Sequence, residues 1–359
     1  MVTGMLFRLF RSLIRSTKFR KEDIKSILVI RMNRIGDMIY TIPLVRTLRN
    51  EFPEATITVL AENTNAEVIQ CQPYIDRVLI YKRGSGILRN TITNIMRTLQ
   101  GADFDLAIGV KGGFSTFLAT AALLSGAKYR TGYKSLKGCF RDRFYNLPVQ
   151  PIEFSTHHQA DACLHLLHAV GVKKEIRDIS LTIPDRFIAS AVDFLMANGV
   201  KQKERLVVFN ISSNREKSTW RTGSFVELGK YLIDRYQCRC IITGVSSDEE
   251  KSSAIRREIG EGSYYYKTAS VMDFAAIVSM SNLLITGEGG SSHIGAAAGP
   301  MVISLFGEAN PLVWRPYGEQ HLVLRQPDCD AKSITVDNVI AAIDMMTSWQ
   351  DAERGDRTT

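Results

Sequence analysis

A glycine-bearing turn near the start of the chain carries an acid that could do proton-transfer chemistry. Asn33 to Asp37 (NRIGD) directly follows a buried apolar stretch, and Asp37 is placed where it could accept a proton from a hydroxyl group. Gly36 would let a ligand approach the backbone closely. The alternative role for Asp37 is to cap the helix that follows, which is common for Asp. The spacing alone does not separate the two roles.

A second turn, from Glu288 to His293 (EGGSSH), opens a helix of small residues. Free backbone N–H groups and the helix dipole suit such a turn to a phosphate. Gly289 and Gly290 remove side chains that would keep a diphosphate away, and Ser291 begins the helix. His293 could donate to a phosphate oxygen or pack at the helix start. An ordinary glycine-rich turn is the simpler alternative.

Two further loops carry side chains suited to a nucleotide. The hydroxyls of Ser212 and Ser213 and the ammonium of Lys217 would suit a diphosphate, although a solvated loop with a serine cap has the same composition. Asp248 or Glu249 could bond a ribose diol, and both equally resemble acids in the first turn of a helix. These loops therefore predict a nucleotide site only in combination.

The elements that would position these residues alternate between buried strands and helices. Apolar stretches typical of parallel strands lie at 26–32, 55–62, 77–83, 104–110, 205–212, 238–244, 282–288 and 301–307. Helical patterns separate them, and the first helix is predicted to begin around Thr41, Ile42 and Pro43. This alternation predicts an α/β fold with two Rossmann-like, doubly wound domains. Ligands bind beyond the carboxyl ends of such strands, so the turns should line a cleft between the domains.

Composition supports four parts in the chain. Its 359 residues, 45% hydrophobic and 23% charged, suit two globular domains. The polar stretch 173–186 is the best linker candidate and puts the boundary near residue 178. We expect a basic amphipathic segment (1–22), an N-terminal Rossmann-like domain (23–178), a C-terminal Rossmann-like domain (179–349) and a disordered tail (350–359).

The positive charge is concentrated at the N-terminus. Residues 1–21 hold six basic residues and no acid, so only +2 of the net +8 belongs to the rest of the chain. No nucleic-acid motif accompanies the charge. The segment would form a basic amphipathic helix, which could lie on an anionic membrane or simply pack on the protein. The six cysteines form no paired framework, which fits a reducing cytoplasm.

Several motifs are missing. No GxGxxG follows a strand, and there is no GxxxxGK[ST], which argues against a nicotinamide enzyme and a P-loop nucleotidase. The pairs Asp103/Asp105 and Asp328/Asp330 mimic a metal-binding DxD. The first lies before a strand and the second in a late loop, so both are interpreted as solvated acids. We expect neither a metal nor a cofactor.

The stretches Arg31 to Ile39, which fits R-x-x-R-I-G-D-x-[IV], and Ser281 to Gly299 resemble the heptosyltransferase-like family of inverting glycosyltransferases, family 9, which has the GT-B fold. The likeness runs from about Ile27 to Ile343. Members often carry D-[ST]-G where this chain has Glu288 and two glycines, and Gly-x-Pro where it has Gly-Pro-Met.

The resemblance implies roles for individual residues. Asp37 would be the general base, Gly290 and His293 would lie at the phosphate helix, and Glu288 would contact the donor sugar. Gly109 and Lys111 stand where members often have Asp and Gln, which leaves the acceptor open. The implied donor set is Ser212, Ser213, Lys217, Asp248, Glu288, Gly289, Gly290, Ser291 and His293, and the acceptor side includes Arg34, Gly36 and Lys111.

The expected function is therefore metal-independent, inverting transfer of a sugar (heptose or a related one) from a nucleotide-diphospho-sugar. The acceptor would be a hydroxyl of a lipopolysaccharide core or another lipid-linked glycan, at the cytoplasmic face of the membrane. The alternative is a catalytically inactive protein of the same fold that binds a sugar nucleotide or glycan.

Overall fold

The computed structural model describes residues 18–82, 88–201, 203–213 and 215–346. Most of the predicted N-terminal segment and all of the predicted tail lie outside these residues. The chain divides into two compact units, Met1–Thr182 and Ile183–Thr359. This division lies four residues beyond the predicted boundary at 178. Residues 176 and 182 belong to the first unit because Ile176 N–H donates to Thr47 Oγ1 at 2.8 Å and Thr182 N–H donates to Gln72 Oε1 at 2.9 Å.

The first unit is built on a six-stranded parallel sheet with the order β3-β2-β1-β4-β5-β6. The order reverses between β1 and β4, so the carboxyl ends of these two strands flank the ligand crevice typical of such sheets. The strands are β1 (Ser26–Ile30), β2 (Thr56–Glu62), β3 (Arg77–Tyr81), β4 (Leu106–Gly109), β5 (Tyr129–Tyr133) and β6 (Leu147–Val149). The helices are α2 (Ile35–Ile39), α3 (Ile42–Glu51), α4 (Asn63–Ala66), α5 (Leu88–Thr98), α6 (Thr116–Leu124) and α7 (Gln159–His165), with 3₁₀ turns at Lys21–Asp23, Phe140–Phe144 and Leu166–Val170.

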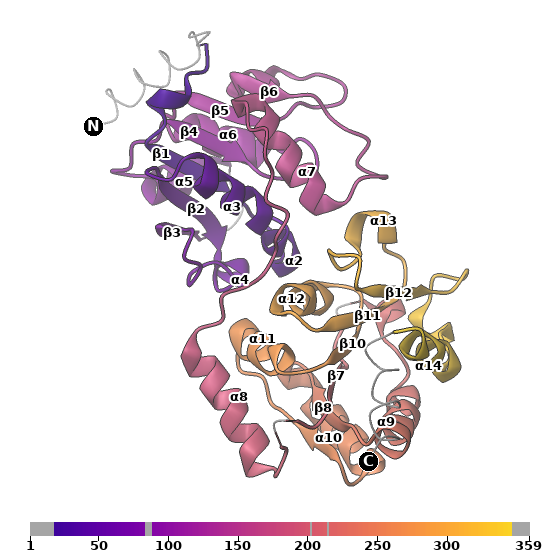
Figure 1. Ribbon diagram of the computed structural model, residues 1–359. Helices are drawn as coiled ribbons and strands as arrows, with labels where there is room; N and C mark the ends of the chain where they lie inside the picture. The colour runs from indigo at the N-terminus through magenta and orange to yellow at the C-terminus, as the bar shows by residue number, and fades with distance from the viewer. Residues whose placement is uncertain (1–17, 83–87, 202, 214, 347–359) are drawn as a thin grey trace. The chain divides into compact units, whose positions relative to one another are not determined.

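The second unit repeats this plan with the order β12-β11-β10-β7-β8-β9, again all parallel. Its reversal lies between β7 and β10. The strands are β7 (Leu206–Asn210), β8 (Arg239–Thr243), β9 (Ser263–Tyr265), β10 (Leu283–Gly287), β11 (Met301–Phe306) and β12 (Leu322–Arg325). The helices are α8 (Asp185–Ala197), α9 (Thr222–Tyr236), α10 (Glu249–Ile259), α11 (Val271–Ser279), α12 (Gly290–Ala298), α13 (Pro311–Trp314) and α14 (Val336–Asp344), with 3₁₀ turns at Glu216–Ser218, Ser246–Asp248 and Ala331–Ser333 (Figure 1).

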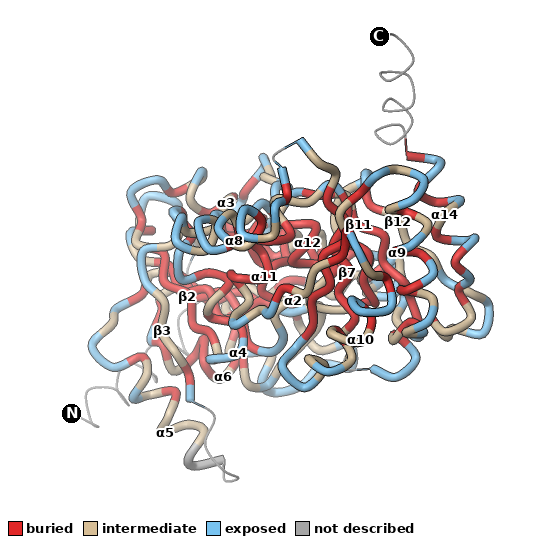
Figure 2. Tube along the Cα trace, turned by 90° about the horizontal axis from the view of Figure 1, so that it is seen from below, coloured by how far each residue is buried: buried red, intermediate tan, exposed pale blue. Residues whose placement is uncertain are grey.

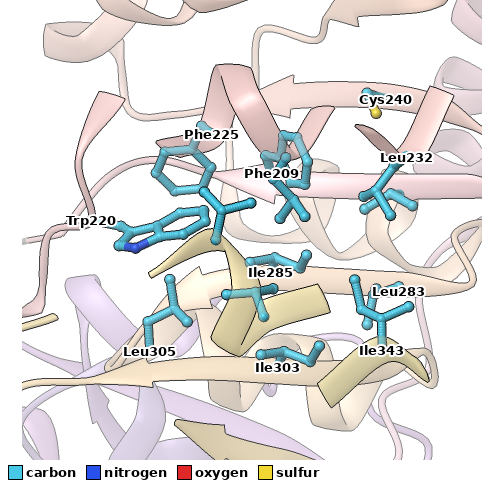
Figure 3. Packing of buried hydrophobic residues seen from close by; sticks show 14 of the residues in the cluster. Phe209, Trp220, Phe225, Leu232, Cys240, Leu283, Ile285, Ile303, Leu305 and Ile343 are labelled. Carbon is cyan, nitrogen blue, oxygen red and sulfur yellow. The ribbon is translucent and has the colours of Figure 1, made fainter. Parts of the chain in front are cut away.

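The central strands of each sheet are buried on both faces, whereas edge strands such as β3 and β12 are partly exposed. Figure 2 shows β2, β7 and β11 buried along most of their length, whereas helices such as α8 and α10 expose one side. In the second unit, Phe209, Trp220 and Phe225 pack with aliphatic residues of β10, β11 and α14 (Figure 3). The Trp220 indole N–H donates to Ile334 O at 2.7 Å, so this buried polar group has a hydrogen-bond partner.

The structure differs from the sequence expectations in several elements. Asp37 lies inside the short helix α2 rather than in an open turn, and α3 begins at Ile42 as predicted. Strands β5, β6, β9 and β12 and helices α8 and α13 were not expected. Strand β5 (YRTGY) has no apolar run that would reveal it in the sequence. Its Arg130 is nevertheless buried, because N–H groups of this residue donate to three oxygen atoms of the chain. Within the described residues, no helix is long and apolar enough to cross a bilayer.

Candidate active site

Asp37 follows the carboxyl end of β1, at the reversal point of the first sheet. Its carboxylate forms an ion pair with Arg31, whose side chain is fully buried, while the Asp37 side chain stays 15% exposed. Arg31 also donates to Val110 O at 2.9 Å, just beyond β4. The guanidinium therefore ties the ends of β1 and β4 together and fixes one edge of the carboxylate.

The two roles weighed for Asp37 are both compatible with its surroundings. The backbone N–H of Arg34, the residue before α2, donates to Asp37 Oδ2 at 3.4 Å, so the side chain does cap its own helix weakly. Gly36 is buried and the Arg34 side chain is exposed. Asn33 adopts φ of +90°, and its carbonyl accepts from Asn65 Nδ2 at 3.2 Å. This left-handed conformation, uncommon outside glycine, is held by α4 and turns the chain sharply before the acid.

In the second unit, Ser212 and Asp248 are brought together. Ser212 Oγ donates to Asp248 Oδ2 at 2.6 Å and accepts from Val245 N–H at 2.9 Å. The loops after β7 and β8 are thus joined through one hydroxyl group. Ser213 Oγ accepts from Arg215 N–H at 3.2 Å, so its hydroxyl shapes the loop locally.

Glu288 follows β10 and is nearly fully buried, with 2% of its side chain exposed. Its Oε1 accepts from the Arg215 guanidinium at 2.9 Å and from Ser218 Oγ at 2.8 Å. Its Oε2 accepts from Ala309 N–H at 3.1 Å. The carboxylate therefore binds together three loops of the site, and one acceptor position on Oε2 is left after these three bonds.

Backbone packing seats the loop that carries Lys217. A Cβ atom on Gly287 would overlap Ser218 O, and one on Gly307 would overlap Lys217 O, so the 217–218 backbone lies directly against the ends of β10 and β11. The Lys217 ammonium is half exposed and lies 2.9 Å from Glu308. The hydrogen bond to Glu308 raises the pKa of Lys217. Exposed pairs of this kind are weak, so a diphosphate could displace Glu308.

The backbone N–H groups at the start of helix α12 are not capped by the side chain of the preceding residue, because that residue is Gly289. Gly289 has φ of +135° and no side chain to accept from the first turn. Ser291 Oγ lies 2.8 Å from Thr286 Oγ1, and Ser292 Oγ donates to Gly289 O at 2.8 Å. His293 is buried with its Nδ1 3.5 Å from Ser292 Oγ. The geometry suits an anion at this turn.

The predicted donor residues all follow carboxyl ends of neighbouring strands around the reversal between β7 and β10. The contacts join Ser212 to Asp248, and Glu288 to the segment that carries Lys217. Asp37, Arg34 and Gly36 lie together in the first unit, and Lys111 is exposed just past β4. That the two sets face one another across a cleft stays a prediction.

The comparisons with known proteins agree with one another. Residues 92–338 match the model of glycosyltransferase family 9 (heptosyltransferase). The chain belongs to glycosyltransferase family 9. A putative glycosyltransferase of Haemophilus influenzae is 23% identical over 91% of this chain and 98% of its own length. Lipopolysaccharide heptosyltransferase 3 of Escherichia coli is 24% identical over 79% of this chain and 83% of its own length.

Solved structures of the same family show the fold. A family 9 glycosyl transferase from Veillonella parvula gives a TM-score of 0.79 at 21% identity, covering 92% of this chain and 99% of that one. E. coli ADP-heptose lipopolysaccharide heptosyltransferase II gives 0.73 at 18% identity, covering 91% and 99%. The family resemblance and the GT-B fold class predicted from the sequence are confirmed.

One departure from the family 9 pattern has a packing reason. A Cβ atom on Gly109 would overlap the hydroxyl of Tyr145, which is buried beside β4 and β5. An aspartate at position 109 would meet this ring, so the aromatic side chain and the glycine belong together. Nothing in the structure explains Lys111 in this way.

Three functional candidates of this family 9 chain were missed by sequence reasoning. Arg31 lies within the quoted R-x-x-R-I-G-D motif, and an arginine at the end of an otherwise apolar strand was a usable signal. Arg215 and Ser218 had no comparable signal, because their contact with Glu288 spans about 70 residues of chain.

Proposed function

We propose that this family 9 glycosyltransferase moves a sugar, heptose or a related one, from a nucleotide-diphospho-sugar to a hydroxyl of a lipopolysaccharide core or another lipid-linked glycan. Relatives support the substrate class: one is named lipopolysaccharide heptosyltransferase 3, and a solved E. coli heptosyltransferase was studied with ADP-2-deoxy-2-fluoro heptose. The reaction would take place at the cytoplasmic face of the membrane. ADP-heptose is the first donor to test.

In the proposed reaction, the acceptor oxygen attacks the anomeric carbon as the bond from that carbon to the diphosphate oxygen breaks. Asp37 takes the hydroxyl proton, and the nucleoside diphosphate leaves with the bonding electron pair. Attack from the side opposite the leaving group inverts the anomeric centre. Arg31 holds the carboxylate in position.

The second unit would bind the leaving group. Lys217 and the uncapped start of α12 offer positive charge for the growing charge on the diphosphate, and Asp248 would bond the ribose. We further propose that this positive charge replaces a divalent metal. Activity that survives treatment with EDTA would support this point, and its complete loss would contradict it.

The observation that carries the proposal is the seating of Asp37 by the buried Arg31 at the reversal point of the first sheet. Asp37→Asn tests it, because the amide keeps a hydrogen bond to Arg31 but is a poor base. We expect release of nucleoside diphosphate in the presence of acceptor to fall about 100-fold or more, with donor affinity nearly unchanged. Asp161→Asn, which alters an exposed pair with Arg177, is the matched control. Unchanged turnover in Asp37→Asn would remove Asp37 from the mechanism.

The rival function is sugar-nucleotide binding without transfer, and the internal bonding of Glu288 favours it, since little of that carboxylate is left for a donor sugar. A thermal-shift screen of nucleotide sugars, followed by a turnover assay with the best binder, separates the two. Binding without release of nucleoside diphosphate from any donor and lipid acceptor would support the rival.

A further inference from the structure

The loop between β5 and β6, residues 134–146, is anchored at its returning end. The buried Arg130 of β5 donates from Nε to Phe144 O at 2.7 Å, and its backbone N–H donates to Asn146 Oδ1 at 2.7 Å. The loop therefore leaves the carboxyl end of β5 and is tied back to the start of the same strand. Its outer part is a fixed surface of the first unit.

The acid of this loop is used to build it. Asp142 accepts from the backbone N–H groups of Ser135 and Cys139, both at 2.8 Å, and from Ser135 Oγ at 3.0 Å. Burial would raise the pKa of Asp142, but these hydrogen bonds outweigh it and lower the pKa overall. The carboxylate thus remains charged, and its hydrogen bonds hold the two ends of the 135–142 turn together.

The outer face of the loop combines exposed apolar and basic side chains. Leu136 is 83% exposed and Phe140 is 68% exposed. Lys137, Arg141 and Arg143 are exposed as well, and no acid in the described part of the chain forms an ion pair with them. Arg143 lies over the Phe140 ring, 5.7 Å from its centroid. Large solvent-exposed apolar side chains beside cations without an ion pair indicate a partner that is both apolar and anionic.

We propose that residues 134–146 form a membrane-docking loop that rests on the surface of an anionic bilayer. Leu136 and Phe140 would enter the boundary between headgroups and acyl chains, and the basic side chains would pair with lipid phosphates. The loop carries Lys134, Lys137, Arg141 and Arg143 against Asp142, a net charge of +3. A soluble anion would account for this charge but not for two exposed apolar side chains, so the bilayer is the partner that fits both.

The start of the described chain lies against the same strand. Phe19 packs edge-on against Tyr129 of β5 at 5.0 Å, and Lys18 O accepts from the Tyr129 hydroxyl at 3.3 Å. The basic N-terminal segment thus joins the fold at the strand that anchors the docking loop. The proposal goes beyond sugar transfer, and vesicle binding can be measured without donor, acceptor or turnover.

The test is co-sedimentation of the full-length protein with phosphatidylcholine vesicles that do or do not contain phosphatidylglycerol. Each cation removed should weaken binding about fivefold, so Lys137→Ser with Arg141→Ser should lower partitioning onto the anionic vesicles about 25-fold. Leu136→Ser with Phe140→Ser should lower it about 10-fold or more. Residues 1–17 are identical in every variant, so differences report on the loop.

Matched controls make the same kinds of change elsewhere. Lys173→Ser with Lys174→Ser removes two exposed cations of the first unit, and Met196→Ser with Met345→Ser removes two exposed apolar side chains of the second. Both should bind vesicles like the unaltered protein, and circular dichroism should show all variants folded. Loop variants that bind as well as the controls would overturn the proposal. Loss of binding in the basic pair alone, with the apolar pair unaffected, would also overturn it, because charge alone would then account for the binding and nothing would enter the bilayer.

Discussion

The guanidinium of Arg215 lies 2.9 Å from the carboxylate of Glu288, and this contact joins the loop after β7 to the turn that opens α12. Ser218 and the backbone N–H of Ala309 complete the set of donors around the same carboxylate. Removal of a buried charge with this many partners strongly destabilises a protein, because the partners are left without an acceptor.

Glu288→Ala should therefore lower the free energy of unfolding by about 3 kcal/mol, since it leaves a guanidinium, a hydroxyl and a backbone N–H without their acceptor. Urea denaturation measures the change. Glu308→Ala is the control: Glu308 is 61% exposed in its pair with Lys217, so its loss should leave the free energy of unfolding close to that of the unaltered protein. Equal effects of the two substitutions would show that the Glu288 contacts carry no stability.

The Ser212–Asp248 bond allows a test of donor binding. Asp248→Ala should weaken binding of the preferred nucleoside diphosphate by about 10-fold or more, because a charge-assisted hydrogen bond that orders two loops is worth about 1.5–3 kcal/mol. Titration calorimetry measures the affinity. The neighbouring change Glu249→Gln, in an exposed pair with Lys267, should leave it unaltered. If Glu249→Gln weakens binding and Asp248→Ala does not, the ribose contact belongs to the other acid.

His321 makes stability depend on pH. Burial, and then the nearby Arg315, lower the pKa of His321 from 6.5 to about 4, and a backbone hydrogen bond with Tyr317 offsets only part of this shift. The unfolded chain takes up a proton at this residue from pH 6.5 downward, whereas the folded chain does so only near pH 4. The stability that the neutral His321 contributes is thus fully present above pH 6.5 and is lost as the pH falls to 4. This loss is about 3 kcal/mol at most.

Substitution of this histidine by leucine should flatten that part of the stability profile. Urea denaturation at a series of pH values between 4 and 7 measures the slope. The exposed His157, replaced by glutamine, should leave the slope as it is in the unaltered protein. A His321→Leu profile as steep as the unaltered one would assign the acid sensitivity to other groups.

The sequence carried most of the fold because its buried parallel strands are long apolar runs. Strands β1, β7, β10 and β11 could be located by composition alone, and α3 from its proline. Strand β5 could not, because Arg130 and Gly132 look like loop residues until Phe144, Asn146 and Tyr145 are packed against them. Short strands such as β9 carry too few residues for any pattern.

The site divides in the same way. The places of Asp37, Ser212 and Glu288 just past strand ends were predictable, because position along a parallel sheet fixes where such residues lie, whereas their roles stay predictions. Their partners were not. Arg215 meets Glu288 through a loop whose path is set by tertiary packing, and nothing local in the sequence reports that path.

Gly287 and Gly307 tolerate mutation less well than the exposed part of the loop that packs on them. The backbone of Lys217 and Ser218 fills the space that any larger residue would need at either glycine, so these two positions admit little change. Of the two side chains, that of Ser218 is buried against Glu288, whereas that of Lys217 is half exposed and has room to change. Descendants of this chain can therefore change how they hold a donor by exchanging Lys217, while the backbone packing beneath it stays the same.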